Sequence, residues 1–103
     1  MKRPFYLDTK HRNEYLRFML GILEDKYFVS RTRLARGMGF KATYLADFVN
    51  DRRTLRRTNL DKIEFFLDDL YESIIEDELD INSFYFMELS ESSKVDKVEY
   101  AKK

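Results

Sequence analysis

The chain has 103 residues, the length of one small domain, with no cysteine, one histidine (His11), three glycines and one proline. This composition excludes a disulfide framework, a thiolate zinc site, a turn-rich β-sandwich and a glycine-rich phosphate loop. No apolar run approaches the roughly 20 residues needed to cross a bilayer. We therefore expect a helical protein of the cytoplasm that uses no cofactor or metal.

The formal net charge of zero hides an uneven distribution of charge along the chain. Residues 1–60 carry 14 basic and 6 acidic side chains (+8), whereas residues 61–103 carry 5 basic and 13 acidic ones (−8). Such separation is typical of a protein that presents one surface to a polyanion. A well-solvated surface without a ligand would show the same pattern.

The first predicted helix begins at a cap, Asp8 or Thr9, and runs to about Lys26. Its apolar residues form two stripes at helical spacing. The first stripe contains Leu16, Met19, Leu20, Leu23 and Tyr27, and the second contains Tyr15, Phe18 and Ile22. Because a helix with two apolar stripes is covered on more than one side, we expect residues 5–7 or another subunit to cover the second.

Two short helices are predicted next. Ser30 or Thr32 can cap the first of them. Gly39 ends it, because glycine enters the left-handed conformation without steric cost. The following helix is expected over residues 41–50.

One long helix is predicted in the acidic half. Asn59 can cap it, and apolar residues at helical spacing continue from Leu60 to about Glu78. The preceding residues 52–58 lack an apolar period and are interpreted as a loop. Residues 83–89 (SFYFMEL) are interpreted as a short strand or one helical turn, and the polar tail from residue 90 is expected to be mobile.

The segment over residues 33–48 has the spacing of a helix-turn-helix, in which two short helices cross through a tight turn. Ala35 is the small residue where the backbones meet, Gly39 makes the turn, and Leu45 anchors the second helix. This segment, R-L-A-R-G-M-G-F-K-A-T-Y-L-A-D-F, resembles the phage repressor and Cro-like (xenobiotic-response-element-type) helix-turn-helix family. The resemblance extends over about residues 16–70, although an ordinary helical hairpin would give the same spacing.

The resemblance implies that the helix over residues 41–50 lies in the DNA major groove. Thr43 can bond a base edge, and Asp47 can accept from a cytosine amino group. By position, the resemblance implies that the residues facing the base edges are Ala42, Thr43, Tyr44 and Asp47. The residues expected to contact phosphate, at helix ends and in the following loop, are Arg31, Lys41, Asn50, Arg52, Arg53, Arg56 and Arg57.

The sequence departs from the family pattern in three respects. The family often pairs an arginine near the end of the first helix with an acid at the end of the third, but Glu24 and Val49 occupy these positions. We therefore expect that pair to be absent. The base-reading helix also lacks the side chains that make bidentate base contacts. The loop DRRTLRRT over residues 51–58 is unusually basic, which suits it to the DNA backbone or a minor groove.

We therefore predict an all-α fold of four to five helices in three segments. Residues 1–80 form a helix-turn-helix DNA-binding domain, residues 81–89 an apolar dimerisation segment, and residues 90–103 a flexible tail. The expected dimer contacts are Phe84, Tyr85, Phe86 and Met87.

The expected function is sequence-specific binding of double-stranded DNA by a homodimeric transcriptional regulator, a repressor, associated with the nucleoid. The alternative is a module that binds a protein partner through its acidic half, as an inhibitor, antitoxin or co-regulator. No nucleophile paired with a base and no cofactor cradle can be placed in the sequence, which argues against an enzyme.

Overall fold

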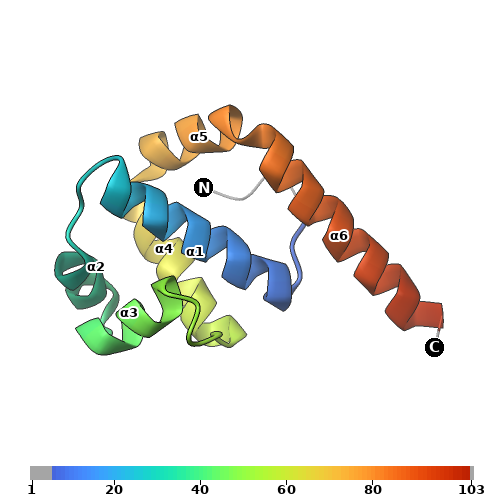
Figure 1. The fold of residues 1–103 in the computed structure, drawn as a ribbon, viewed down its shortest axis with the longest axis horizontal. Helices are drawn as coiled ribbons and strands as arrows, with labels where there is room; N and C mark the ends of the chain where they lie inside the picture. Colours follow the sequence, from blue (N-terminus) through green and yellow to red (C-terminus); the bar gives the residue numbers. More distant parts are fainter. Residues whose placement is uncertain (1–5, 103) are drawn as a thin grey trace.

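The computed structural model describes residues 6–102, with side chains placed for residues 6–93. Over residues 6–102 the chain forms six helices and no strand, which confirms the all-α class (Figure 1). The helices are α1 (Thr9–Asp25), α2 (Arg31–Met38), α3 (Ala42–Val49), α4 (Arg57–Leu70), α5 (Glu72–Ile81) and α6 (Ser83–Lys102). The expected number of four to five helices was too small.

The predicted boundaries of the first three helices are confirmed to within a residue or two. The side chain of Asp8 accepts a hydrogen bond from the His11 amide at the start of α1. Ser30 caps α2 in the same way, and Gly39 ends it in the left-handed conformation with φ of 81°. A cap satisfies backbone groups that the helix itself leaves without partners, and it lies within a few residues of those groups in the chain. The ends of these helices can therefore be predicted from neighbouring residues.

The single helix predicted over residues 60–78 is two helices in the structure. α4 begins at Arg57 with Arg56 as its N-cap, so Asn59 lies inside the first turn and does not act as the cap. Tyr71, with φ of −128° and ψ of 23°, separates α4 from α5. The change of direction lets α4 pack on α1 while α5 packs on α6. Apolar spacing continues across Tyr71, so the pattern alone could not reveal the turn.

Residues 83–102 form one helix, α6, and not a short strand or turn followed by a separate tail. Phe86 and Leu89 are buried, and so are Ser90 and Ser93 at the start of the expected tail. The Ser93 hydroxyl accepts a hydrogen bond from the Asp8 amide at 3.3 Å. The side chains after residue 93 lie outside the described residues, so the mobility of the tail stays a prediction.

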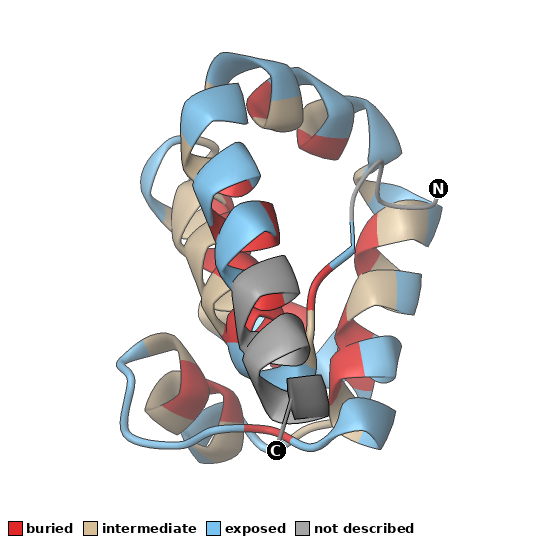
Figure 2. Ribbon diagram, turned by 90° about the vertical axis from the view of Figure 1, so that its right-hand side faces the viewer, coloured by how far each residue is buried: buried red, intermediate tan, exposed pale blue. Residues whose placement is uncertain are grey.

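α6 covers the second apolar stripe of α1. Tyr15 meets Phe86 edge to face with ring centroids 5.3 Å apart, and Phe18 lies 4.6 Å from the ring of Tyr85. The cover comes from residues 85 and 86 of the same chain, which the sequence analysis did not name. Of the residues that it named, Leu7 is buried in the same core cluster, and Phe5 lies outside the described residues. Figure 2 shows the result, with buried residues on the inner sides of the helices and exposed residues outside.

A buried carboxylate joins α5 to the end of α1. Glu78, whose side chain is 3% exposed, accepts a hydrogen bond from Lys26 at 2.7 Å and another from the Tyr27 hydroxyl at 3.2 Å. The bond from Lys26 lowers the pKa of Glu78 below its ordinary value, against the opposing effect of desolvation. The ionised form of Glu78 is thus the one that the folded state favours.

We expect Glu78→Gln to destabilise the protein at neutral pH and much less in acid. A carboxyl group with a lowered pKa in the folded state contributes stability above its unfolded pKa, near 4.5, and loses it as the pH falls through the folded value. Urea unfolding of both proteins between pH 7 and about pH 3 measures this difference. Exposed Glu76→Gln on the same helix is the control. A difference independent of pH would contradict the prediction.

Candidate nucleic-acid interface

α2 and α3 are packed together through the turn over residues 39–41. The Gly39 amide donates to the carbonyls of Ala35 and Arg36, and the Phe40 amide donates to Ala35 at 2.8 Å. Ala35 and Leu45 are fully buried. The small residue, the glycine and the anchoring leucine therefore occupy the places that their spacing predicted.

The basic loop between α3 and α4, residues 50–56, is fixed to α1 by two polar side chains. Buried Asn13 donates to the Leu55 carbonyl at 3.1 Å and accepts from the Leu55 amide at 2.7 Å. Arg17 donates to the Phe48 carbonyl at 2.7 Å and to the Arg53 carbonyl at 3.2 Å. The arginines of the loop therefore project from a backbone that is held in place.

Arg17 also links α1 to the end of α3, a link that the sequence analysis did not identify. Its guanidinium lies 4.8 Å from the centroid of the Phe48 ring and 3.4 Å from the Asp51 carboxylate. The sequence analysis concerned only an arginine–acid pair at the positions of Glu24 and Val49, and it did not identify this link through Arg17. The positions compared in the sequence were Glu24 and Val49, whereas the principal partner of Arg17 is a backbone carbonyl, which a residue pattern does not show.

The first turns of α3 and α4 meet beside the basic loop. The Asn59 side-chain amide, in the first turn of α4, donates to the hydroxyl of Tyr44, in the first turn of α3, at 2.7 Å. The guanidinium of Arg53 lies over the same tyrosine, 4.4 Å from the ring centroid. This contact brings two helix N-termini and a cation to one part of the surface.

Neither of these two helices has a side-chain cap among the described residues. The N-cap residues, Lys41 for α3 and Arg56 for α4, make no capping hydrogen bond. In α4 the Asn59 amide donates to the Arg56 carbonyl at 3.0 Å, and the N–H groups before it have no side-chain acceptor. Each of the two helix ends has a partial positive charge. An anion held here would meet backbone donors and guanidinium groups together.

The predicted base-reading residues differ in how far their side chains are exposed. Ala42 and Thr43 are exposed at the start of α3, and Asp47 is half-buried one turn later. Tyr44 is half-buried, with its hydroxyl bonded by Asn59 and one ring face covered by Arg53. Tyr44 therefore supports the surface, while Ala42 and Thr43 are open to a ligand.

All but one of the predicted phosphate-binding residues are exposed. The exposed ones are Lys41, Asn50, Arg52, Arg53, Arg56 and Arg57. Arg31 is the exception, since it forms a bidentate pair with Glu24 at 2.8 and 2.7 Å, and this hydrogen bonding raises its pKa. Arg31 thus joins α1 to α2 and is a poor candidate for a phosphate contact.

No family model, curated protein or solved structure matches this chain. In the part of the chain that the structure describes, no helix is both long and apolar enough to cross a membrane. Nor is there, within that part, a group of three or more acidic or histidine side chains that could hold a metal ion.

The sequence analysis did not identify the residues whose side chains hold this surface in place. Asn13 precedes Leu16 by three residues, on the buried side of α1, and a buried polar residue beside an apolar stripe is a signal that it has a specific partner. Asn59 was interpreted as a cap, although its side chain bonds Tyr44. Both contacts join residues far apart in the chain, so only the folded structure identifies the partners.

Proposed function

We propose that the protein is a sequence-specific double-stranded DNA-binding regulator, a repressor, that places α3 in the major groove. The observation that supports this most is the meeting of the first turns of α3 and α4 beside the arginines of a fixed loop. Phosphate groups suit both the open N–H groups and the arginine side chains. The cytoplasm, at the nucleoid, is the location that fits this function.

The contacts divide into two kinds with different consequences. The loop arginines and helix ends supply affinity that depends on salt and fixes the register on the duplex. Thr43 and Ala42 at the start of α3 supply base contacts, through a hydroxyl and through methyl groups. A helix of eight residues is about 12 Å long, which is close to the width of the major groove.

A homodimer is part of this proposal. One short helix that reads a few base pairs gives little affinity, and two linked copies multiply it. The two copies of α3 would then contact half-sites about one DNA turn apart, near 34 Å. Phe84 and Met87 are exposed and suit a dimer contact, whereas Phe86 is 2% exposed in the core of its own chain and does not.

The direct test is fluorescence anisotropy with a random duplex and with a duplex selected from a random pool, across a series of salt concentrations. We expect binding to both at low salt and tighter binding to the selected duplex. No binding at low salt would contradict the proposal. In that case the exposed acidic residues of α5, Glu76, Asp77 and Asp80, favour the alternative of a basic protein partner.

We expect Thr43→Ala to reduce discrimination between the selected and random duplexes by about 2- to 10-fold, the equivalent of one hydrogen bond. The slope of affinity against salt should not change, because no phosphate contact is lost. Competition anisotropy measures both quantities. Thr9→Ala, an exposed threonine on α1, is the control. Unchanged site preference in Thr43→Ala would show that this residue is not on the reading face.

A further inference from the structure

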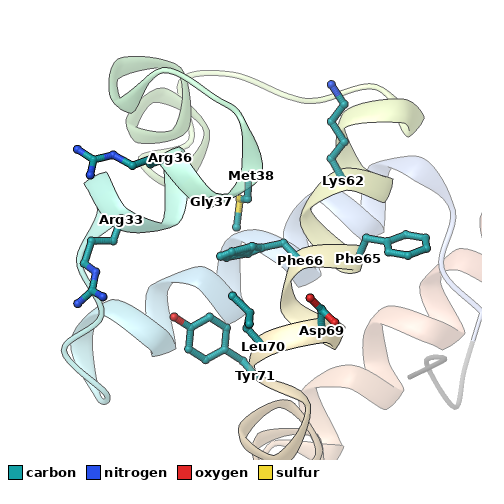
Figure 3. Close-up of a pocket in the computed structure, with 10 residues that line it drawn as sticks. All are labelled: Arg33, Arg36, Gly37, Met38, Lys62, Phe65, Phe66, Asp69, Leu70 and Tyr71. Carbon is teal, nitrogen blue, oxygen red and sulfur yellow. The ribbon is translucent and has the colours of Figure 1, made fainter.

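A groove of about 930 Å³ lies between α2 and α4 (Figure 3). Its lining includes the apolar side chains of Met38, Phe66 and Tyr71. The ring of Phe66 lies directly against α2, since a Cβ atom on Gly37 would come within 2.5 Å of it. The close approach of this ring to the α2 backbone fixes the apolar floor of the groove.

The margin of the groove is basic and carries two exposed apolar side chains. Arg33 and Arg36 extend from α2, Lys62 extends from α4, and the acidic side chain in the lining is Asp69. Phe65 is 79% exposed and Leu70 is 62% exposed. Large apolar side chains that remain in water beside an apolar groove mark an interaction surface.

One outer face of α6 has the complementary character. Phe84 is 84% exposed and Met87 is 64% exposed, and Glu88 is exposed one turn after Phe84. Residues three and four apart lie on the same face of a helix, so these three side chains form one apolar and acidic face. The opposite face of α6 is occupied by Phe86 and Leu89 in the core.

We infer that α6 of a second copy docks in the groove between α2 and α4, and that each copy does this to the other. Phe84 and Met87 would lie on the apolar floor, with Glu88 near the arginines of α2. A helix whose apolar anchors enter a groove is a common mode of recognition. The chain's own α6 cannot be the occupant, because it packs on α1 and α5 and extends toward the end of the long axis opposite to α2 (Figure 1).

This inference deepens the homodimer of the proposed function but does not require DNA binding. The charges are matched, since the groove has three basic and one acidic side chain while the docking face carries Glu88. A reciprocal arrangement uses each surface once per copy and closes as a dimer, whereas a one-way contact would continue into a chain of copies. Sedimentation can therefore separate the two arrangements.

The test is sedimentation velocity of the full chain without DNA over a range of concentrations. The groove variant is Phe65→Asp with Leu70→Asp, and the helix variant is Phe84→Asp with Met87→Asp. All four positions are exposed, so circular dichroism should show the wild-type fold in both variants. We expect a wild-type dimer and at least a 10-fold higher dissociation constant in each variant. Phe28→Asp, at an aromatic residue that is 87% exposed in the loop between α1 and α2, should dimerise as the wild type does.

Mixing the two variants gives the decisive result. The groove variant retains its α6 anchors and the helix variant retains its groove, so a labelled groove variant should form a 1:1 complex with the helix variant. A groove variant that still dimerises alone would indicate α6–α6 packing, and a helix variant that still dimerises would indicate groove–groove packing. Either result, or a wild-type protein that stays monomeric at millimolar concentration, would overturn the inference. Loss of DNA binding in a protein that dimerises would overturn only the proposed function.

Discussion

Replacing the four exposed arginines of the basic loop and the start of α4 with alanine should weaken binding to every DNA duplex and reduce its dependence on salt. The replaced residues are Arg52, Arg53, Arg56 and Arg57. Each phosphate contact contributes about 0.9 to the slope of log affinity against log salt, so the slope should become less steep by about 3.6 per chain. The affinity at about 0.1 M salt should fall roughly 1,000-fold. Anisotropy with one duplex at several salt concentrations measures both effects.

Two single substitutions provide a matched control for this prediction. Arg56→Ala removes one charge from the loop, and Lys10→Ala removes one from an exposed position on α1. We expect a slope change of about 0.9 for Arg56→Ala and none for Lys10→Ala. Because these side chains are exposed, the free energy of unfolding should stay within about 0.5 kcal/mol of the wild type in each single variant. An unchanged slope in the fourfold variant would exclude the loop from the interface.

Asn13→Ala should cause the largest loss of stability among the polar substitutions that we propose. The change leaves both the amide and the carbonyl of Leu55 without their partner inside the protein. An unsatisfied buried group costs about 1–3 kcal/mol, so we expect the free energy of unfolding to fall by about 3 kcal/mol. Urea unfolding measures this loss, and faster hydrogen exchange of the Leu55 amide would show that the loop has been released.

The control for Asn13→Ala is Asn50→Ala. Asn50 is exposed at the end of α3, and its side chain makes no hydrogen bond within the described residues. Its replacement should change the free energy of unfolding by less than about 0.5 kcal/mol. Equal stability of Asn13→Ala and the wild type would show that Asn13 does not hold the loop.

The first three helices could be predicted because their ends depend on residues close together in the chain. Asp8 and Ser30 each bond an amide three residues later, and Gly39 adopts a conformation that few other residues tolerate. The apolar residues between these signals then show which face is buried. Local chemistry is sufficient for this part of the fold.

The acidic half could not be predicted in the same way, because its shape depends on packing between distant segments. The turn at Tyr71 interrupts an apolar period that the sequence shows as continuous. Residues 83–89 are apolar on several sides, since Phe86 enters the core while Phe84 remains outside. A short segment with that pattern does not distinguish a strand from a helix that continues into a polar tail.

The candidate interface was predicted in part. The exposure of Thr43 and of the loop arginines agrees with the positions that the family resemblance implied. The role of Tyr44 could not be predicted, because its partner Asn59 is fifteen residues away and was expected to act as a cap. Arg31 is paired with Glu24 through a contact between the end of α1 and α2, which becomes visible only when the two helices are folded together.

We propose that the first turns of α3 and α4, with the loop between the two helices, form the surface that contacts DNA. Titration of the isotopically labelled protein with the selected duplex, followed by amide NMR, locates the contact surface residue by residue. We predict that the largest changes in chemical shift and intensity occur in residues 41–60, with little change in α5. Changes confined to α5 and α6, or spread evenly over the molecule, would contradict the claim.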